Sequence, residues 1–235
     1  MGSAPAGLVR RTITLAPGSP LRGLAGPGGE LWFVIAGTGR LDAGTLRGAA
    51  VGEGTGCRIP PGAEYRLGAE DDILLDAVSL PAPPAPPGRT TPPAAAVIAE
   101  EGPRLAELAA CEVERTGDRR FRVLLGPGRG CEAATQFVGE IPPGRAPEHR
   151  HPYDEVVLVL DGEGVAHAGD SDRALAPGTS VHLPRGLPHC LENTGQRTLV
   201  VLGVFHPGGS PAAKTAGTAT TAGTAKTAGT ADASR

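Results

Sequence analysis

Short segments in which apolar and polar residues alternate follow one another along most of this chain, and turn sequences separate them. The clearest segments are LVRRTITL, ELWFVIAG, GRLDAGTLRG, DDILLDAVSL and GDRRFRVLLG, and the turns include GPGG, GEGTG and PPG. A period of two indicates β-strands with one buried face, and glycine and proline mark the connections between strands. The pattern therefore predicts an all-β chain with few helices.

The segment VVLVLDGEG departs from strict alternation because its apolar residues are nearly continuous. Such a run is typical of a strand that is buried on both faces, and DGEG is a hairpin turn. Counting from Glu155, we expect Val157 and Val159 to face inward. Val156, Leu158 and Leu160 should then pack outward.

Of the six histidines, two lie just before this strand and a third lies after it. His149 and His151 are two residues apart, so they share a face on a strand. Glu155 follows four residues after His151 and joins that face if the strand is unbroken, although Pro152 permits a bulge. His189 comes from a second strand, after the turn LPRGLP. Three imidazoles and one carboxylate suit a divalent transition metal; histidines packed for structure, or a surface pair, are the alternative.

The spacing of these residues resembles the two-part signature of the cupin family. Only the leading Gly144 departs from the usual pattern, since it lies one residue closer to His149. The matching positions are His149, His151, Glu155 and Gly162 in the first part and Gly178, Pro184, Gly186, His189 and Asn193 in the second.

The resemblance implies a double-sheet, jelly-roll β-barrel that holds one divalent metal. The implied ligands are His149, His151, Glu155 and His189. Iron, manganese, nickel, copper, cobalt and zinc all accept such a ligand set. Four protein ligands on an octahedral ion leave two positions open, as a catalytic site requires.

The first half of the chain repeats part of the signature. Glu30 precedes Gly37 by the spacing that separates Glu155 from Gly162, and the run from Gly54 to Tyr65 follows the second part. No histidine occurs before His149, and Tyr65 stands where the late histidine would be. The repeat predicts a second, degenerate cupin barrel without a metal, in which Glu30 and Tyr65 pack or line a small pocket.

Composition shifts suggest four segments. Residues 8–80 form the degenerate N-terminal barrel, and residues 81–96, PAPPAPPGRTTPPAAA, form a proline-rich, semi-rigid linker. Residues 97–208 form the metal-binding C-terminal barrel, although the strand after the linker could pack back on the first barrel. Residues 209–235 are a disordered tail, because their repeated TAGTA lacks large apolar side chains.

Charge and composition exclude several kinds of partner. The formal net charge of −3 includes no basic block, and aromatic residues make up only 3% of the chain. Neither nucleic acid nor an anionic membrane surface is an expected partner. No apolar run approaches the roughly 20 residues of a membrane span, and the four cysteines form no CxxC pair. We expect a cytoplasmic protein with reduced thiols, a small-molecule substrate and, as one arrangement that covers strand edges, a homodimer.

Three functions are compatible with the expected site. The first is an oxidoreductase of the dioxygenase type that acts on a small, metal-chelating, oxygenated substrate. The second is an isomerase, decarboxylase or lyase that uses the metal as a Lewis acid, and the third is a non-catalytic module that binds a metal or small ligand.

Two further features of the sequence leave alternatives open. His182 is either an acid–base group that supports the site or an ordinary strand residue. Arg119, Arg120 and Arg122 either form a solvated face or clamp a substrate anion.

Overall fold

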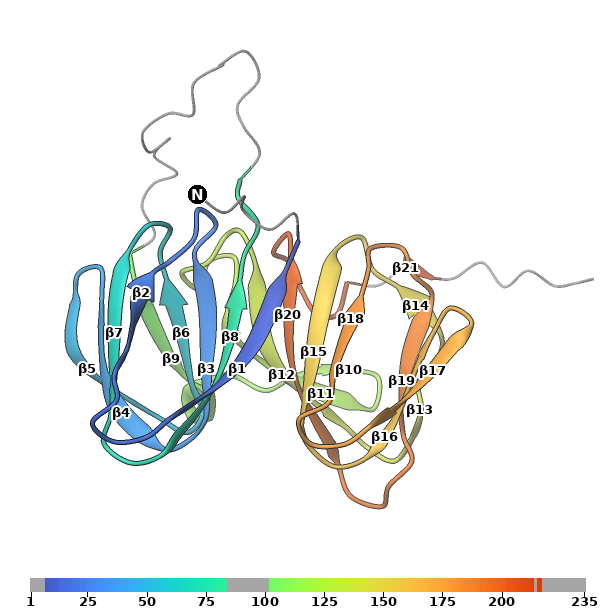
Figure 1. The fold of residues 1–235 in the computed structure, drawn as a ribbon. Coiled ribbons are helices and arrows are strands. Elements are labelled where there is room, and N and C mark those ends of the chain that lie inside the picture. Colours follow the sequence, from blue (N-terminus) through green and yellow to red (C-terminus); the bar gives the residue numbers. More distant parts are fainter. Residues whose placement is uncertain (1–6, 84–101, 214, 217–235) are drawn as a thin grey trace, which may run out of the picture.

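The structure, a computed structural model, describes residues 7–83, 102–213 and 215–216. Two β-barrels lie side by side, each built from two sheets packed face to face (Figure 1). Apart from strands and turns, the described residues contain one short 3-10 helix, η1 (Leu108–Ala110). The predicted all-β class and the two jelly-roll barrels are confirmed.

The N-terminal barrel encloses its own apolar core between two sheets, in the orders β1-β8-β3-β6-β9 and β2-β7-β4-β5. All pairings within them are antiparallel. The strands are β1 (Val9–Leu15), β2 (Leu21–Leu24), β3 (Glu30–Ala36), β4 (Thr38–Ala43), β5 (Leu46–Gly52), β6 (Thr55–Ile59), β7 (Glu64–Ala69), β8 (Ile73–Ser79) and β9 (Arg104–Glu107).

The C-terminal barrel has the sheet orders β10-β11-β12-β20-β15-β18 and β17-β16-β19-β14-β21, with β13 also paired to β19. The strands are β10 (Glu114–Thr116), β11 (Arg119–Leu125), β12 (Thr135–Ile141), β13 (Gly144–Arg145), β14 (His149–Arg150), β15 (Asp154–Asp161), β16 (Gly164–Ala168), β17 (Ser171–Leu175), β18 (Ser180–Leu183), β19 (His189–Asn193), β20 (Leu199–His206) and β21 (Thr215–Ala216).

The internal repeat is visible in the backbone of the two barrels. Strand β3 shifts register four residues after Glu30, and β15 does so four residues after Glu155. A glycine with positive φ follows each strand directly, with 86° at Gly37 and 88° at Gly162. A Cβ at Gly162 would lie 2.8 Å from the Cα of Leu199. Both the positive φ and this close approach require glycine there.

Strand β15 has a buried face on each side, as its apolar run predicts. Val157 and Val159 pack in the core of the C-terminal barrel. Val156 and Leu158 point the other way and join a third core, between the barrels. The expected alternation from Glu155 is therefore confirmed, and the outward face meets the other barrel rather than solvent.

The core between the barrels brings residues of β3 and β8 against residues of β12, β15 and β20. Polar contacts cross the same interface. The Gln136 side-chain amide donates to the Trp32 carbonyl at 3.2 Å, and Arg10 donates to the Leu202 carbonyl at 3.3 Å. Arg10 also pairs with the buried Asp76, with 3.0 Å between Nε and Oδ1.

Strand β9 continues a sheet of the N-terminal barrel, since Arg104–Glu107 pairs with β6. The strand after the proline-rich segment thus packs back on the first barrel. The division of the chain at residues 80 and 96 stays a prediction, and most of the expected linker and tail, residues 84–101, 214 and 217–235, lies outside the described residues.

Among the described residues, no helix has the length and apolar character needed to cross a membrane.

Candidate metal centre

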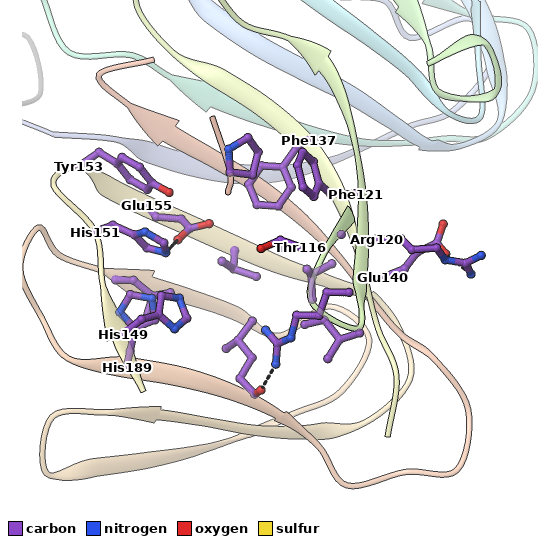
Figure 2. Close-up of a pocket in the computed structure, with 18 residues that line it drawn as sticks. Thr116, Arg120, Phe121, Phe137, Glu140, His149, His151, Tyr153, Glu155 and His189 are labelled. Atoms are coloured by element: carbon purple, nitrogen blue, oxygen red, sulfur yellow. Dashed lines mark hydrogen bonds and ion pairs between the residues drawn. The ribbon is translucent and has the colours of Figure 1, made fainter. Parts of the chain in front are cut away.

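Three buried histidines converge inside the C-terminal barrel (Figure 2). His149 lies on β14, His189 lies opposite it on β19, and His151 follows β14 directly. Their candidate ligand atoms all lie within 4.8 Å of one another. Metal–nitrogen bonds of about 2.0–2.1 Å place two ligand nitrogens at most about 4.2 Å apart, so small side-chain movements would let one ion contact all three histidines.

Each of the three imidazoles is oriented by a backbone carbonyl. His149 Nδ1 lies 3.1 Å from the carbonyl oxygen of Pro147. His151 Nδ1 lies 3.1 Å from that of Ala213, and His189 Nδ1 lies 2.8 Å from that of Leu187. A carbonyl oxygen only accepts, so each Nδ1 carries the proton, and in the neutral ring the lone pair is on Nε2. This arrangement is typical of metal-binding histidines.

Glu155 adds a buried carboxylate to the histidines. Its Oε2 lies 3.6 Å from His151 Nε2, and the side chain points into the cavity. Glu155 occupies the first inward position of β15, so the bend at Pro152 does not take it off the face of the histidines. The structure thus brings the three histidines together and places Glu155 beside His151, and this donor set fits a divalent transition metal.

Aromatic rings form one wall of the cavity. Tyr153 stacks on His151 with ring centroids 4.5 Å apart, and Phe205 stacks on the other face of Tyr153 at 4.0 Å. Burial, reinforced by the nearby Glu155 carboxylate, raises the pKa of the Tyr153 phenol. Tyr153 therefore stays neutral and keeps its proton as a possible hydrogen-bond donor. Sequence reasoning missed this residue, although its spacing from His151 could have indicated it.

The three arginines of β11 differ in their surroundings, since Arg119 and Arg120 both line the cavity and Arg122 does not. Arg119 and Phe121 line the cavity, together with His189 and Leu191 of β19. Arg120 and Arg122 both pair with Glu140, at 2.6 and 2.7 Å. The interpretation of all three as one solvated face therefore does not hold for Arg119.

His182, the candidate acid–base group, lies outside the cavity. Its side chain is 56% exposed, and its Nε2 lies 4.0 Å from Asp154 Oδ1. On β18 it pairs with Val156, whose side chain faces the other barrel. A direct role in the chemistry has no support from this position.

The segment after β20 crosses the same site. Pro211 lines the cavity, Ala213 provides the carbonyl for His151, and β21 pairs with β14. Nothing in the low-complexity sequence indicates this contact, because backbone carbonyls carry no sequence signal.

The corresponding region of the N-terminal barrel is filled. Trp32 stands two residues after Glu30, as Val157 stands after Glu155, and it packs edge-on against Tyr65 with centroids 4.8 Å apart. Glu30 accepts from the Trp32 indole at 2.6 Å and from Arg11 at 2.8 Å. A guanidinium therefore neutralises the carboxylate, and Tyr65 packs in the core.

A family model described as "Cupin domain" matches residues 137–205. Residues 137–205, within the C-terminal barrel, therefore form a cupin domain. The matched residues run from β12 to β20 and include the four residues of the candidate centre. No curated protein sequence matches the chain.

Several solved structures share this fold. Protein Ylba from E. coli is 14% identical, with 86% of this chain and 77% of that chain covered and a TM-score of 0.66. Oxalate decarboxylase from Lactobacillus farciminis, in a formate complex, is 16% identical, with coverages of 87% and 78% and a TM-score of 0.66. A variant of Bacillus subtilis oxalate decarboxylase is 17% identical, with coverages of 85% and 69% and a TM-score of 0.64. At these identities the likeness establishes the fold.

Proposed function

We propose that the C-terminal barrel binds one divalent transition metal through His149, His151, Glu155 and His189, and that this cupin is a metal-dependent enzyme. The observation that carries the proposal is the shared orientation of the histidines. Three buried imidazoles, each held through Nδ1 by a backbone carbonyl, direct their other nitrogens toward a common point in a cavity. Packing alone gives no reason for this convergence.

The size of the cavity favours a small substrate. Its volume is about 80 Å³, whereas one water molecule needs roughly 10–15 Å³ by the same measure. A bound metal would supply Lewis acidity toward substrate oxygens. The chain's own residues would exclude bulk water through the apolar wall, orient the substrate and offer the neutral Tyr153 phenol as a donor.

Two reaction classes remain candidates. Metal-dependent decarboxylation, or a related lyase or isomerase reaction, is supported by the oxalate decarboxylases among the structures with the same two-barrel fold. A reaction of the dioxygenase type is supported by the histidine-rich donor set, which suits redox-active metals. Both need a small substrate with two oxygens that can chelate the ion.

Metal analysis followed by substrate assays tests the proposal. The purified protein should contain about one divalent ion per chain, and His189→Ala should contain almost none. Oxalate and small 2-keto acids are then supplied while CO₂ release and oxygen uptake are recorded together. CO₂ without oxygen consumption supports the decarboxylase, and stoichiometric oxygen uptake supports the dioxygenase. A wild-type protein that takes up no metal would refute the metal centre, and metal binding without turnover of any substrate would leave a binding module.

A further inference from the structure

Arg119 is a cation in a mostly apolar cavity. It lies at the start of β11, and the cavity walls around it include Phe121, Phe137 and Leu191. No carboxylate of the described residues lies within ion-pair distance of its guanidinium. Glu140, the other carboxylate at this cavity besides Glu155, is already shared by Arg120 and Arg122.

Among the described residues, the guanidinium makes one hydrogen bond, which orients it without neutralising it. Arg119 donates to the Leu191 carbonyl at 2.7 Å. Leu191 lies two residues after His189 on β19, so this bond ties Arg119 to the strand that carries a candidate ligand. A carbonyl oxygen is neutral, and a guanidinium has further N–H donors in a planar fork.

Arg119 is half-buried, and even partial burial without a close anion is unfavourable for a cation. Burial lowers the pKa of the Arg119 guanidinium, and the attraction of the neighbouring Asp118 only partly offsets this effect. The group still keeps its proton, because arginine does not deprotonate in proteins. An anionic group of a ligand would provide the missing compensation.

We infer that Arg119 anchors a carboxylate of the substrate in the metal cavity, so that the substrate is a small organic acid. This inference rests on the proposed metal centre and specifies what that centre binds. Glu155 would neutralise only one of the two charges of a divalent ion, and Arg119 adds another positive charge. The cavity therefore favours anions, and the guanidinium fork suits two carboxylate oxygens.

Two chelating probes separate the role of Arg119 from that of the metal. Oxalate offers oxygens to the metal and has further carboxylate oxygens to contact Arg119. Acetohydroxamate chelates through two oxygens and carries a methyl group instead of further oxygens. Binding of both probes is measured by calorimetry on metal-loaded protein, with the metal content checked after each titration.

Arg119→Gln should weaken oxalate binding by at least about tenfold, since hydrogen bonds to charged groups are among the strong ones. It should leave acetohydroxamate binding and metal content unchanged. Arg119→Lys should restore part of the oxalate affinity, because it keeps the charge without the fork. The matched control is Arg122→Gln on the same strand, which removes an arginine that pairs with Glu140 and does not line the cavity.

Different outcomes would overturn the two proposals. Equal oxalate affinity in wild type and Arg119→Gln, or an equal loss for both probes, would refute the carboxylate anchor while the metal centre stands. A wild-type protein that holds no metal would refute the centre, and the anchor with it.

Discussion

At the scale of single residues, hydrogen bonds to Nδ1 determine which nitrogen each histidine offers. The carbonyls of Pro147, Leu187 and Ala213 come from three different parts of the C-terminal half. Each selects the tautomer with the Nε2 lone pair and restricts rotation of the ring. Backbone atoms as well as side chains therefore orient the candidate metal ligands.

Removing one imidazole should therefore abolish tight metal binding. We expect His151→Ala or His189→Ala to reduce the affinity by more than the roughly 10–100-fold typical of changes to groups that only orient a ligand. His182→Ala is the control, because that side chain is exposed and outside the cavity. Titration with Co²⁺ or Zn²⁺ measures the effect, and wild-type affinity in His189→Ala would contradict it.

Glu155→Gln tests the only anionic member of the proposed set. The substitution keeps the shape but removes the negative charge, so the site should hold a divalent cation at least about tenfold less tightly. The fold should persist, because the amide can occupy the same buried position. Metal content and thermal melting of this variant decide the question. Full metal occupancy and an unchanged melting temperature would show that Glu155 is not a ligand.

At the scale of elements, the segment from Gly208 to β21 closes part of the site. The Gly208 amide donates to Ala133 and the Gly209 amide to Thr135, at 2.9 and 3.0 Å. From these anchors the chain passes Pro211 and reaches Ala213 beside His151. A piece of sequence without large side chains therefore orients a candidate ligand.

Shortening the chain tests this segment. A chain that ends at Gly209 should bind metal about 10–100-fold more weakly, because His151 loses the carbonyl that orients it. A chain that ends at Ala216 is the matched control and should bind as the full chain does. The nitrogen chemical shifts of the His151 ring in metal-depleted protein give an independent readout. An identical tautomer and affinity in both truncated chains would contradict the prediction.

At the scale of the whole molecule, an ion pair is buried between the barrels. Burial raises the pKa of Asp76 to about 6, even though Arg10 attracts the carboxylate. The same burial lowers the pKa of Arg10. For both partners the removal of water outweighs the pairing, as is common for buried ion pairs.

The stability of the folded chain should therefore depend on pH through Asp76. Its pKa in the folded chain exceeds the roughly 3.9 of an unfolded aspartate, so the folded chain binds an extra proton between about pH 4 and 6. The contribution of Asp76 to the free energy of unfolding should fall as pH rises through this window, by up to roughly 3 kcal/mol. The melting temperature of wild type minus that of Asp76→Asn should be larger at pH 5 than at pH 8. A difference independent of pH would contradict this.

The two barrels also show how one architecture serves two purposes. In the N-terminal barrel Arg11 balances Glu30, and Trp32 and Tyr65 fill the interior. In the C-terminal barrel the smaller Val157 leaves space beside the histidines. The N-terminal barrel then contributes a large apolar face against which β12, β15 and β20 pack.

The sequence by itself determined the all-β class, the turn glycines and the internal repeat, and it predicted the four residues of the candidate centre. These features depend on spacing along one strand or one turn, and alternation with a period of two is a local property of the backbone. The inward positions of Val157 and Val159 follow from the same rule.

Only the tertiary structure decided which distant segments meet. The approach of Arg119 to Leu191, of Ala213 to His151 and of Arg11 to Glu30 depends on strand register and on how each barrel closes. The packing of β15 against the other barrel likewise depends on long-range pairing. Backbone carbonyls are the same in every residue, and burial of a single arginine depends on neighbours far along the chain. Local sequence patterns therefore do not predict these contacts.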